Sequence, residues 1–205
     1  MSTKKIYLVR HGQTEFNKLG IVQGSAVNSS LNETGRLQAQ AFFDAYKDIP
    51  FQAVYTSALN RSIESVQAFI DLTIPHYIRP GLNEISWGEM DGKTATHTEH
   101  NEYKDLLARW QSGDIEHKMW GGESPVDVQK RQEPVIQELL ESPHDTILVC
   151  MHGRAIRILL SLLTQTHLAK MDQFEHGNLC LYLLEGSLSS IQIISANDQR
   201  HLNHL

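Results

Sequence analysis

Three neighbouring residues near the start of the chain, Arg10, His11 and Gly12, combine a cation, an imidazole and a flexible backbone position. They directly follow residues 6–9, an apolar run typical of a buried strand, so they stand where the chain leaves the core. An imidazole can act as a nucleophile, and a guanidinium matches the oxygens of an anion. Alone, the triplet is equally compatible with a surface turn that holds a half-exposed histidine.

Two more basic residues follow apolar segments in the same way. Arg61 comes shortly after the strand-like residues 53–57, and His152 comes directly after residues 145–151. The carboxyl ends of parallel strands share one edge of a sheet, so these groups should meet the basic pair at the start of the chain. Basic groups crowded in a cleft repel one another unless an anion is bound, and arginine forks suit phosphate. The pattern predicts a phosphate site.

Arg61 carries a separate signal, because it falls in the first turn of a helical pattern formed by Leu59, Ile63, Val66 and Ile70. Helix N-termini attract anions and repel cations, so an arginine there is unfavourable without a ligand. We expect an anion bound by both the guanidinium and the backbone N–H groups.

A carboxylate that could carry a proton is found in a glycine-punctuated loop, LNEISWGEMDG, after a predicted strand at residues 76–80. Glu84 lies closest to the end of that strand, and Glu89 and Asp91 lie further into the loop. Loop carboxylates are usually only solvated, but binding and catalytic groups concentrate on loops that a scaffold positions. Glu84 is therefore the candidate for proton transfer.

The elements that must position these groups alternate between strands and helices, which indicates an α/β fold with a parallel sheet. One helix is predicted from Asn32 to about residue 48, because Leu37, Ala41 and Ala45 recur at helical spacing. A second is predicted over 124–141, with a kink at Pro134. A third should follow His152 and bury Ile156, Leu159, Leu160 and Leu163. Residues 179–184 and 190–194 are predicted to form a hairpin, and 18–30 to form a loop.

Composition limits the classes of partner. The chain has 205 residues, which predicts one domain over 1–205, with 94–123 as an inserted lid. Its formal net charge of −6 argues against nucleic acid and anionic membranes as partners. The apolar runs are too short for a membrane span or a signal peptide. Cys150 and Cys180 lie in apolar runs, which is typical of buried, reduced thiols, so we expect a cytoplasmic protein.

Taken together, the motifs resemble the histidine phosphatase superfamily, also called the phosphoglycerate mutase-like family. The resemblance covers almost the entire chain, and its blocks fall in the family order. They are LVRHGQTEFN at 8–17, Gln23 with Gly24, SALNRSIESV at 57–66, LNEISWGEMDG at 82–92, GGESPVDVQKR at 121–131 and VCMHGRAIRILL at 149–160.

This resemblance implies a three-layer α/β/α fold with a mostly parallel central sheet, a small phosphorylated substrate, and no metal or other cofactor. Neighbouring arginines would keep a nucleophilic imidazole unprotonated and stabilise the charge on the transferred phosphoryl group. The implied catalytic residues are His11, the nucleophile that becomes phosphohistidine, Glu84, the proton donor, and His152. The implied phosphate pocket consists of Arg10, Asn17, Arg61 and again His152, and Gln23 and Gly24 are the implied substrate contacts.

The chain departs from the family pattern at Met151, Ser62, Ser65 and Val66, positions that belong to the scaffold more than to the pocket. It lacks the longer insertion and extended tail of phosphoglycerate mutases proper, which favours a phosphatase over a mutase. The alternatives are phosphoglycerate mutase-type phosphoryl transfer and a pocket that binds phosphoesters without turnover.

A metal hydrolase is a third alternative, because His97 with His100 and His201 with His204 have the i, i+3 spacing of metal ligands on a helix. No neighbouring set of Asp or Cys ligands completes either pair. The sequence does not predict the physiological substrate or the oligomeric state.

Overall fold

The computed structural model describes residues 3–94, 97–187 and 190–205, with the side chains of 97–100 outside the description. Its strands are β1 Lys4–Arg10, β2 Ala53–Thr56, β3 His76–Ile78, β4 Thr146–Met151, β5 Leu181–Ser187 and β6 Ser190–Asp198. Its helices are α1 Glu15–Leu19, α2 Glu33–Tyr46, α3 Asn60–Ser65, α4 Gln67–Ile70, α5 His97–Ser112, α6 Pro125–Glu141 and α7 Gly153–Leu163. Short 3₁₀ turns cover Pro80–Leu82, Gly88–Met90, Leu168–Gln173 and Arg200–Leu202.

The strands form one mixed sheet in the order β3-β2-β4-β1-β5-β6. The first four are mutually parallel, whereas β5 runs antiparallel to β1 and forms a hairpin with β6. This arrangement confirms the predicted α/β class, the mostly parallel sheet and the terminal hairpin. Because β4 lies between β2 and β1, the carboxyl ends of these three strands are direct neighbours.

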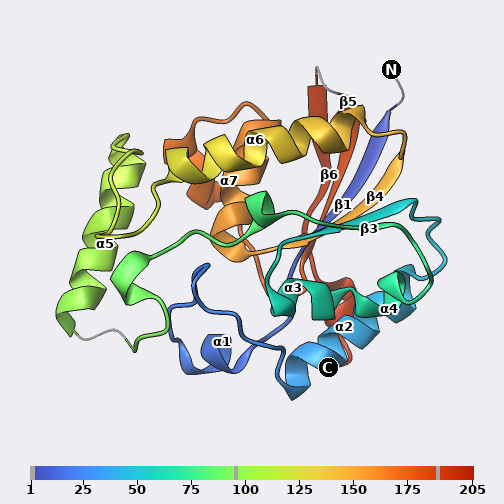
Figure 1. Ribbon diagram of the computed structural model, residues 1–205, viewed down its shortest axis with the longest axis horizontal. Coiled ribbons are helices and arrows are strands. Elements are labelled where there is room, and N and C mark those ends of the chain that lie inside the picture. Colours follow the sequence, from blue (N-terminus) through green and yellow to red (C-terminus); the bar gives the residue numbers. More distant parts are fainter. Residues whose placement is uncertain (1–2, 95–96, 188–189) are drawn as a thin grey trace.

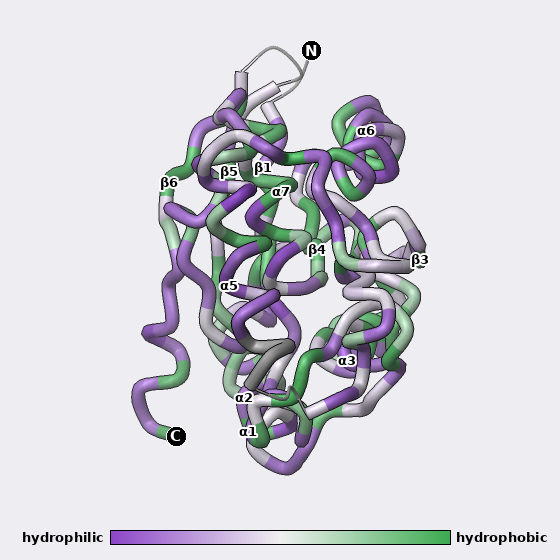
Figure 2. Tube along the Cα trace, turned by 90° about the vertical axis from the view of Figure 1, so that its left-hand side faces the viewer, coloured by the Kyte–Doolittle hydropathy of each residue, from purple (hydrophilic) through white to green (hydrophobic). Residues whose placement is uncertain are grey.

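Helices cover both faces of the sheet, as the alternation along β1 requires (Figure 1). Ile6 and Leu8 belong to the core under α6 and α7. Tyr7 and Val9 belong to the core on the opposite face, where Phe42 of α2 and Phe69 of α4 pack. Figure 2 shows the hydrophobic residues concentrated along the inner strands, whereas α6 alternates between hydrophobic and hydrophilic residues. The three-layer architecture is thereby confirmed.

A third apolar cluster lies beside the sheet and anchors α5, the helix drawn apart from the layers in Figure 1. Leu106 and Trp110 of α5 pack there with Trp87, Val128 and Met171. The predicted lid at 94–123 includes this helix, and its residues 95–96 lie outside the described part of the chain. The lid and the single-domain assignment stay predictions.

The structure corrects three expectations about local structure. The segment expected to be a loop from residue 18 begins inside α1, which has a capping box between Thr14 and Asn17. Asn32 caps α2 as expected, but Leu37 is 53% exposed and Ala45 is also exposed. The first turn of α2 packs instead through Gly35 against the backbone of Gln13. A Cβ atom at Gly35 would lie only 2.1 Å from the Gln13 carbonyl oxygen, so this close contact requires glycine.

The helix expected over Leu59, Ile63, Val66 and Ile70 is divided into α3 and α4, because Val66 leaves the helical conformation with φ −125° and ψ 14°. Directly before the break, the Ser65 hydroxyl donates to the Arg61 carbonyl and accepts the Gly12 N–H. Hydroxyls that bond to the backbone in this way compete with regular helix geometry. The break therefore comes with a contact between α3 and the start of the candidate site.

Candidate active site

The strand register brings two histidines together at the carboxyl edge of the sheet. Arg10 at the end of β1 pairs with Met151 at the end of β4, and the His11 N–H donates to the Met151 carbonyl over 3.0 Å. The next residue of each strand is thus His11 or His152, and their ring centroids are 5.1 Å apart. Both side chains are buried.

One ring nitrogen of His11 is held and the other is free of protein partners. Nδ1 lies 2.7 Å from the carbonyl oxygen of Gly12, a contact that requires Nδ1 to carry the proton. The described residues give Nε2 no hydrogen bond, so this nitrogen keeps its lone pair. Burial, and then the charges of Arg61 and Arg10, hold the pKa of His11 well below its usual value. His11 is a neutral imidazole at neutral pH.

Arg10 and His176 form a second contact beside His11. Nη1 of Arg10 lies 3.3 Å from Nδ1 of His176, and the Arg10 Nε is buried without a hydrogen-bond partner among the described residues. An unpaired buried guanidinium nitrogen is costly, so this donor fits an anion in the cavity. Burial and neighbouring arginines lower the pKa of His176 to about 3. Neutral His176 accepts from Arg10 at Nδ1 and keeps its Nε2–H as a donor.

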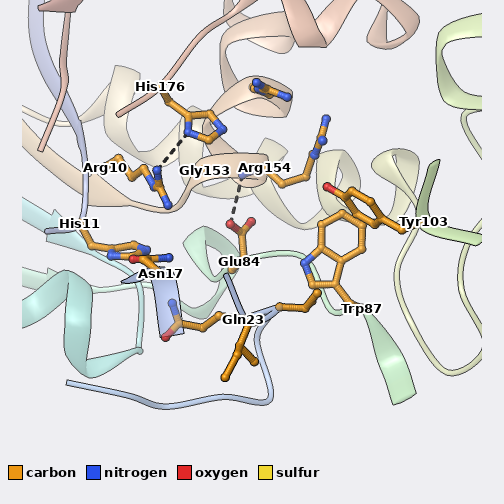
Figure 3. Close-up of a pocket in the computed structure, with 13 residues that line it drawn as sticks. Arg10, His11, Asn17, Gln23, Glu84, Trp87, Tyr103, Gly153, Arg154 and His176 are labelled. Carbon is orange, nitrogen blue, oxygen red and sulfur yellow. Dashed lines mark hydrogen bonds between the residues drawn. The ribbon is translucent and has the colours of Figure 1, made fainter. Parts of the chain in front are cut away.

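Asn17 has its carboxamide oriented by two donors. Its Oδ1 accepts from the Thr14 N–H and from the Asn178 side chain, each over 3.2 Å. The Asn178 amide also donates to the His11 carbonyl over 3.1 Å. With its oxygen occupied, Asn17 has its NH₂ group left for a ligand, and Figure 3 shows its side chain next to His11. The capping box of α1 thus prepares an anion contact.

Arg61 and His152 are fully buried behind this group, and their polar atoms contact the protein. Arg61 donates from Nη1 to the Val27 carbonyl over 2.5 Å, from Nη2 to the Gly24 carbonyl over 3.2 Å, and from Nε to Nδ1 of His152 over 3.2 Å. His152 Nε2 lies 2.7 Å from the Ser57 hydroxyl. Because Nδ1 of His152 accepts, Nε2 carries the proton and donates to Ser57. Both nitrogens of His152 are therefore occupied.

Glu84 is buried and bridges the strand-end loop to the start of α7. Its Oε1 accepts the N–H groups of Ile85 and Ala155, each over 2.9 Å, and its Oε2 accepts the Arg154 N–H over 3.1 Å. A carboxyl oxygen has two lone-pair positions, so Oε2 has one left. In Figure 3 the carboxyl group lies between His11 and Arg154.

A cavity of about 340 Å³ opens over these groups. Of the residues predicted from sequence, Arg10, His11, Asn17, Gln23 and Glu84 line it, whereas Arg61 and His152 lie behind it and Gly24 packs against Asp91. The further lining residues are Ile21, Val22, Trp87, Tyr103, Gly153, Arg154, Arg157 and His176.

Sequence reasoning missed His176, Arg154 and Arg157 as residues of the cavity. The two arginines are three residues apart on α7, directly after the predicted His152, so the helical period places them on one face. That spacing was a usable signal. His176 precedes β5 in an irregular segment and gave none.

The described residues contain no group of three or more His, Cys, Asp or Glu side chains able to hold a metal ion. The side chains of His97 and His100 lie outside the described part of the chain. His201 packs in edge contact with Phe42 and Tyr46, with ring centroids 5.3 and 5.6 Å away. Of the helices in the described ranges, none has the length and apolar composition needed to cross a bilayer.

Comparisons with known proteins place these features in a family. The sequence model of the histidine phosphatase superfamily (branch 1) matches residues 6–199. The chain is 28% identical over 162 residues to "Putative phosphoserine phosphatase 2" of Hydrogenobacter thermophilus, covering 78% of this chain and 79% of the relative. It is 32% identical over 163 residues to the 6-phosphofructo-2-kinase/fructose-2,6-bisphosphatase of Gallus gallus, covering 78% of this chain and 33% of that longer relative.

Solved structures agree with the sequence comparison. The mycobacterial glucosyl-3-phosphoglycerate phosphatase Rv2419c in complex with VO3 has a TM-score of 0.84 at 25% identity, covering 96% of this chain and 100% of that one. YhfR of Bacillus stearothermophilus has the same TM-score and identity, covering 98% of this chain and 100% of its own.

Proposed function

The chain belongs to the histidine phosphatase superfamily, and from that premise we propose that it hydrolyses phosphomonoesters through a phosphohistidine at His11. One observation carries the proposal. A buried, neutral imidazole has its Nδ1 proton held by the Gly12 carbonyl and its Nε2 free beside Arg10 and Asn17. That combination is what a nitrogen nucleophile for phosphorus requires.

In the first step, Nε2 of His11 forms a bond to phosphorus while the bond from phosphorus to the ester oxygen breaks. Arg10 and the Asn17 amide donate to the phosphoryl oxygens, whose charge they stabilise in the transition state. His11 keeps its Nδ1 proton and donates it to the Gly12 carbonyl, and this hydrogen bond stabilises the positive charge that develops on the ring. No step requires a metal ion or an organic cofactor.

Glu84 supplies the proton that the leaving oxygen needs. The remaining lone-pair position of Oε2 is the place for this proton, since the other positions used on the carboxyl group accept backbone N–H groups. In the second step a water attacks phosphorus, the nitrogen–phosphorus bond breaks, and Glu84 takes a proton from that water. The group thus acts first as acid and then as base.

Arg61 supplies positive charge behind the reacting phosphate, and the neutral His152 acts as a positioning residue that holds Arg61 in place. Burial lowers the pKa of Arg61 to about 10, and a bound dianion would offset the cost of its buried charge. His152 holds the Arg61 Nε, and Ser57 holds His152. Gln23 is fixed by Thr14 and Ser29 at the wall of the cavity and serves as a substrate contact. Gly24 allows Asp91 to approach its backbone.

The substrate class is a small phosphorylated metabolite, because 340 Å³ is at the low end for ligand cavities. The names of the relatives, a phosphoserine phosphatase and a glucosyl-3-phosphoglycerate phosphatase, agree with hydrolysis rather than mutase transfer. Residues 94–123 serve as a lid on one domain. The net charge of −6 gives no footprint for nucleic acid or membrane, and two free buried thiols fit the cytoplasm.

The test is phosphate release, with EDTA present, from p-nitrophenyl phosphate, sugar phosphates and 3-phosphoglycerate, comparing wild type with His11→Ala. We expect turnover in EDTA that vanishes in His11→Ala. Wild type that traps phosphate on His11 without releasing it would indicate mutase-type transfer. Wild type with neither release nor trapped phosphate would indicate a binding module, and loss of turnover in EDTA would indicate a metal hydrolase.

A further inference from the structure

Two arginines that the proposed reaction does not use also line the cavity. They are Arg154 and Arg157 of α7. In Figure 3 the Arg154 side chain, Trp87 and Tyr103 lie on one side of Glu84, and His11 lies on the other. We infer that Arg154 and Arg157 form a second anion site that binds a carboxylate of the phosphorylated substrate. This inference rests on the proposed function and names its substrate class.

Both guanidinium groups are held in place by protein contacts. Each donates from Nη1 to the same oxygen, Oδ1 of Asp172, and Gln111 of α5 donates to the other oxygen over 3.1 Å. Arg157 also donates from Nε to the Phe174 carbonyl over 3.0 Å. The Arg154 guanidinium lies 5.5 Å from the centre of the Trp110 ring. Such fixed donors are preorganised for a planar anion.

The charges around Arg154 and Arg157 do not balance. Arg154 and Arg157 share the single carboxylate of Asp172, and their side chains are 7% and 19% exposed. The dianionic phosphate beside His11 is matched by Arg10 and Arg61, and Glu84 carries no charge while it holds the proton for the leaving oxygen. One positive charge remains, beside nitrogen donors that have no further partner among the described residues. A carboxylate supplies that one charge, whereas a second phosphate would bring about two.

Arg154 also links the proposed proton donor to the second anion site. Its backbone N–H holds the Glu84 carboxyl group, and its side chain reaches the Asp172 carboxylate. The proton donor and the second anion site therefore share one residue. In a substrate that places its leaving oxygen at Glu84 and its carboxylate at Arg154, only a few bonds separate these two groups. Such a short substrate agrees with the small volume of the cavity.

The experiment compares kcat/KM for two matched pairs of substrates. In the first pair, 3-phosphoglycerate has a carboxylate where racemic glycerol 3-phosphate has a hydroxymethyl group. In the second pair, O-phosphoserine has a carboxylate where phosphoethanolamine has a hydrogen. Fructose 1,6-bisphosphate and fructose 6-phosphate test a second phosphate. Each is assayed with wild type, Arg154→Met, Arg154→Lys and the control Arg79→Met, whose arginine pairs with Glu138 away from the cavity.

We expect wild type and Arg79→Met to prefer the carboxylated member of each pair by about tenfold to a hundredfold. Arg154→Met should lose that preference through a higher KM, and Arg154→Lys should restore part of it. If Arg154→Met does not fold, Arg157→Met provides the same comparison.

Three results would overturn the inference: equal kcat/KM within the pairs, a preference that survives both methionine variants, or a larger gain from the second phosphate. Failure of the proposed function looks different, because no substrate would then show hydrolysis that depends on His11.

Discussion

His11 and His152 occupy equivalent positions in the sheet and differ in their hydrogen bonds. Each follows the last residue of a buried parallel strand, each precedes a glycine, and their rings are 5.1 Å apart. Burial and neighbouring arginines hold the pKa of both well below the usual value. Their hydrogen bonds differ, because His11 has a free Nε2 while His152 has both nitrogens occupied by Arg61 and Ser57.

Under the proposed function, hydrogen-bond partners, more than position or burial, separate the nucleophile from the positioning residue. A lone pair that already accepts from a guanidinium cannot attack phosphorus. The Gly12 carbonyl fixes the tautomer of His11, and Arg61 and Ser57 fix that of His152. Each prediction below removes one part of this asymmetry.

The largest effect is expected from His11→Asn set against His152→Asn. His11→Asn should lower kcat about ten-thousandfold or more, because the nucleophile is lost. His152→Asn should lower kcat/KM about ten- to a hundredfold, because Arg61 loses one of its anchors. Steady-state kinetics on p-nitrophenyl phosphate checks both, and equal losses in the two variants would contradict the assignment of roles.

Glu84→Gln should act next in size, and only where the leaving group needs a proton. Sugar phosphates, with poor leaving groups, should slow about a hundred- to a thousandfold, whereas p-nitrophenyl phosphate should slow far less. The amide can still accept backbone N–H groups at its oxygen, so the link to α7 is partly kept. A plot of rate against leaving-group pKa provides the measurement, and equal losses on all substrates would refute the role of acid.

Ser57→Ala should have a smaller effect that passes through His152. It removes the acceptor of the His152 Nε2 proton, so we expect about tenfold lower kcat/KM and an unchanged ability to form phosphohistidine. Ser112→Ala, at an exposed hydroxyl that bonds to the Arg109 carbonyl, is the matched control. Loss of phosphohistidine in Ser57→Ala would make His152 more than a positioning residue.

The last prediction concerns stability and pH rather than catalysis. A histidine whose pKa falls on folding binds more protons when unfolded, so its contribution is full above pH 6.5 and is lost as pH falls. Because the pKa of His176 is about 3, the free energy of unfolding should fall by about 1.4 kcal/mol for each pH unit as the pH is lowered from 6 to 4. His176→Gln should flatten urea-unfolding free energies over that range. An unchanged slope would contradict the neutral state of His176.

Much of this could be predicted from the sequence. The apolar runs before Arg10 and His152 predicted strand ends at one edge of a parallel sheet, and the parallel pairing of Arg10 with Met151 places both histidines at that edge. Asn32 and Ser124 cap α2 and α6 as predicted, because capping depends on one side chain and its nearest backbone.

Other features depend on contacts between distant segments. The exposure of Leu37 follows from the approach of Gly35 to Gln13, and the break at Val66 comes with the contact between Ser65 and Gly12. The different hydrogen bonds of the two histidines depend on Ser57 and on the carbonyl of Gly12. Local periodicity carries no information about such long-range partners.

The central claim is that the free Nε2 of His11 becomes phosphorylated, and rapid quenching during turnover tests it most directly. Enzyme mixed with radiolabelled p-nitrophenyl phosphate is quenched in base, digested and mapped by mass spectrometry, for wild type, His11→Asn and His152→Asn. The account predicts acid-labile, base-stable phosphate on His11 in wild type and His152→Asn, and none in His11→Asn. Phosphate on His152, or on any residue in His11→Asn, would contradict it.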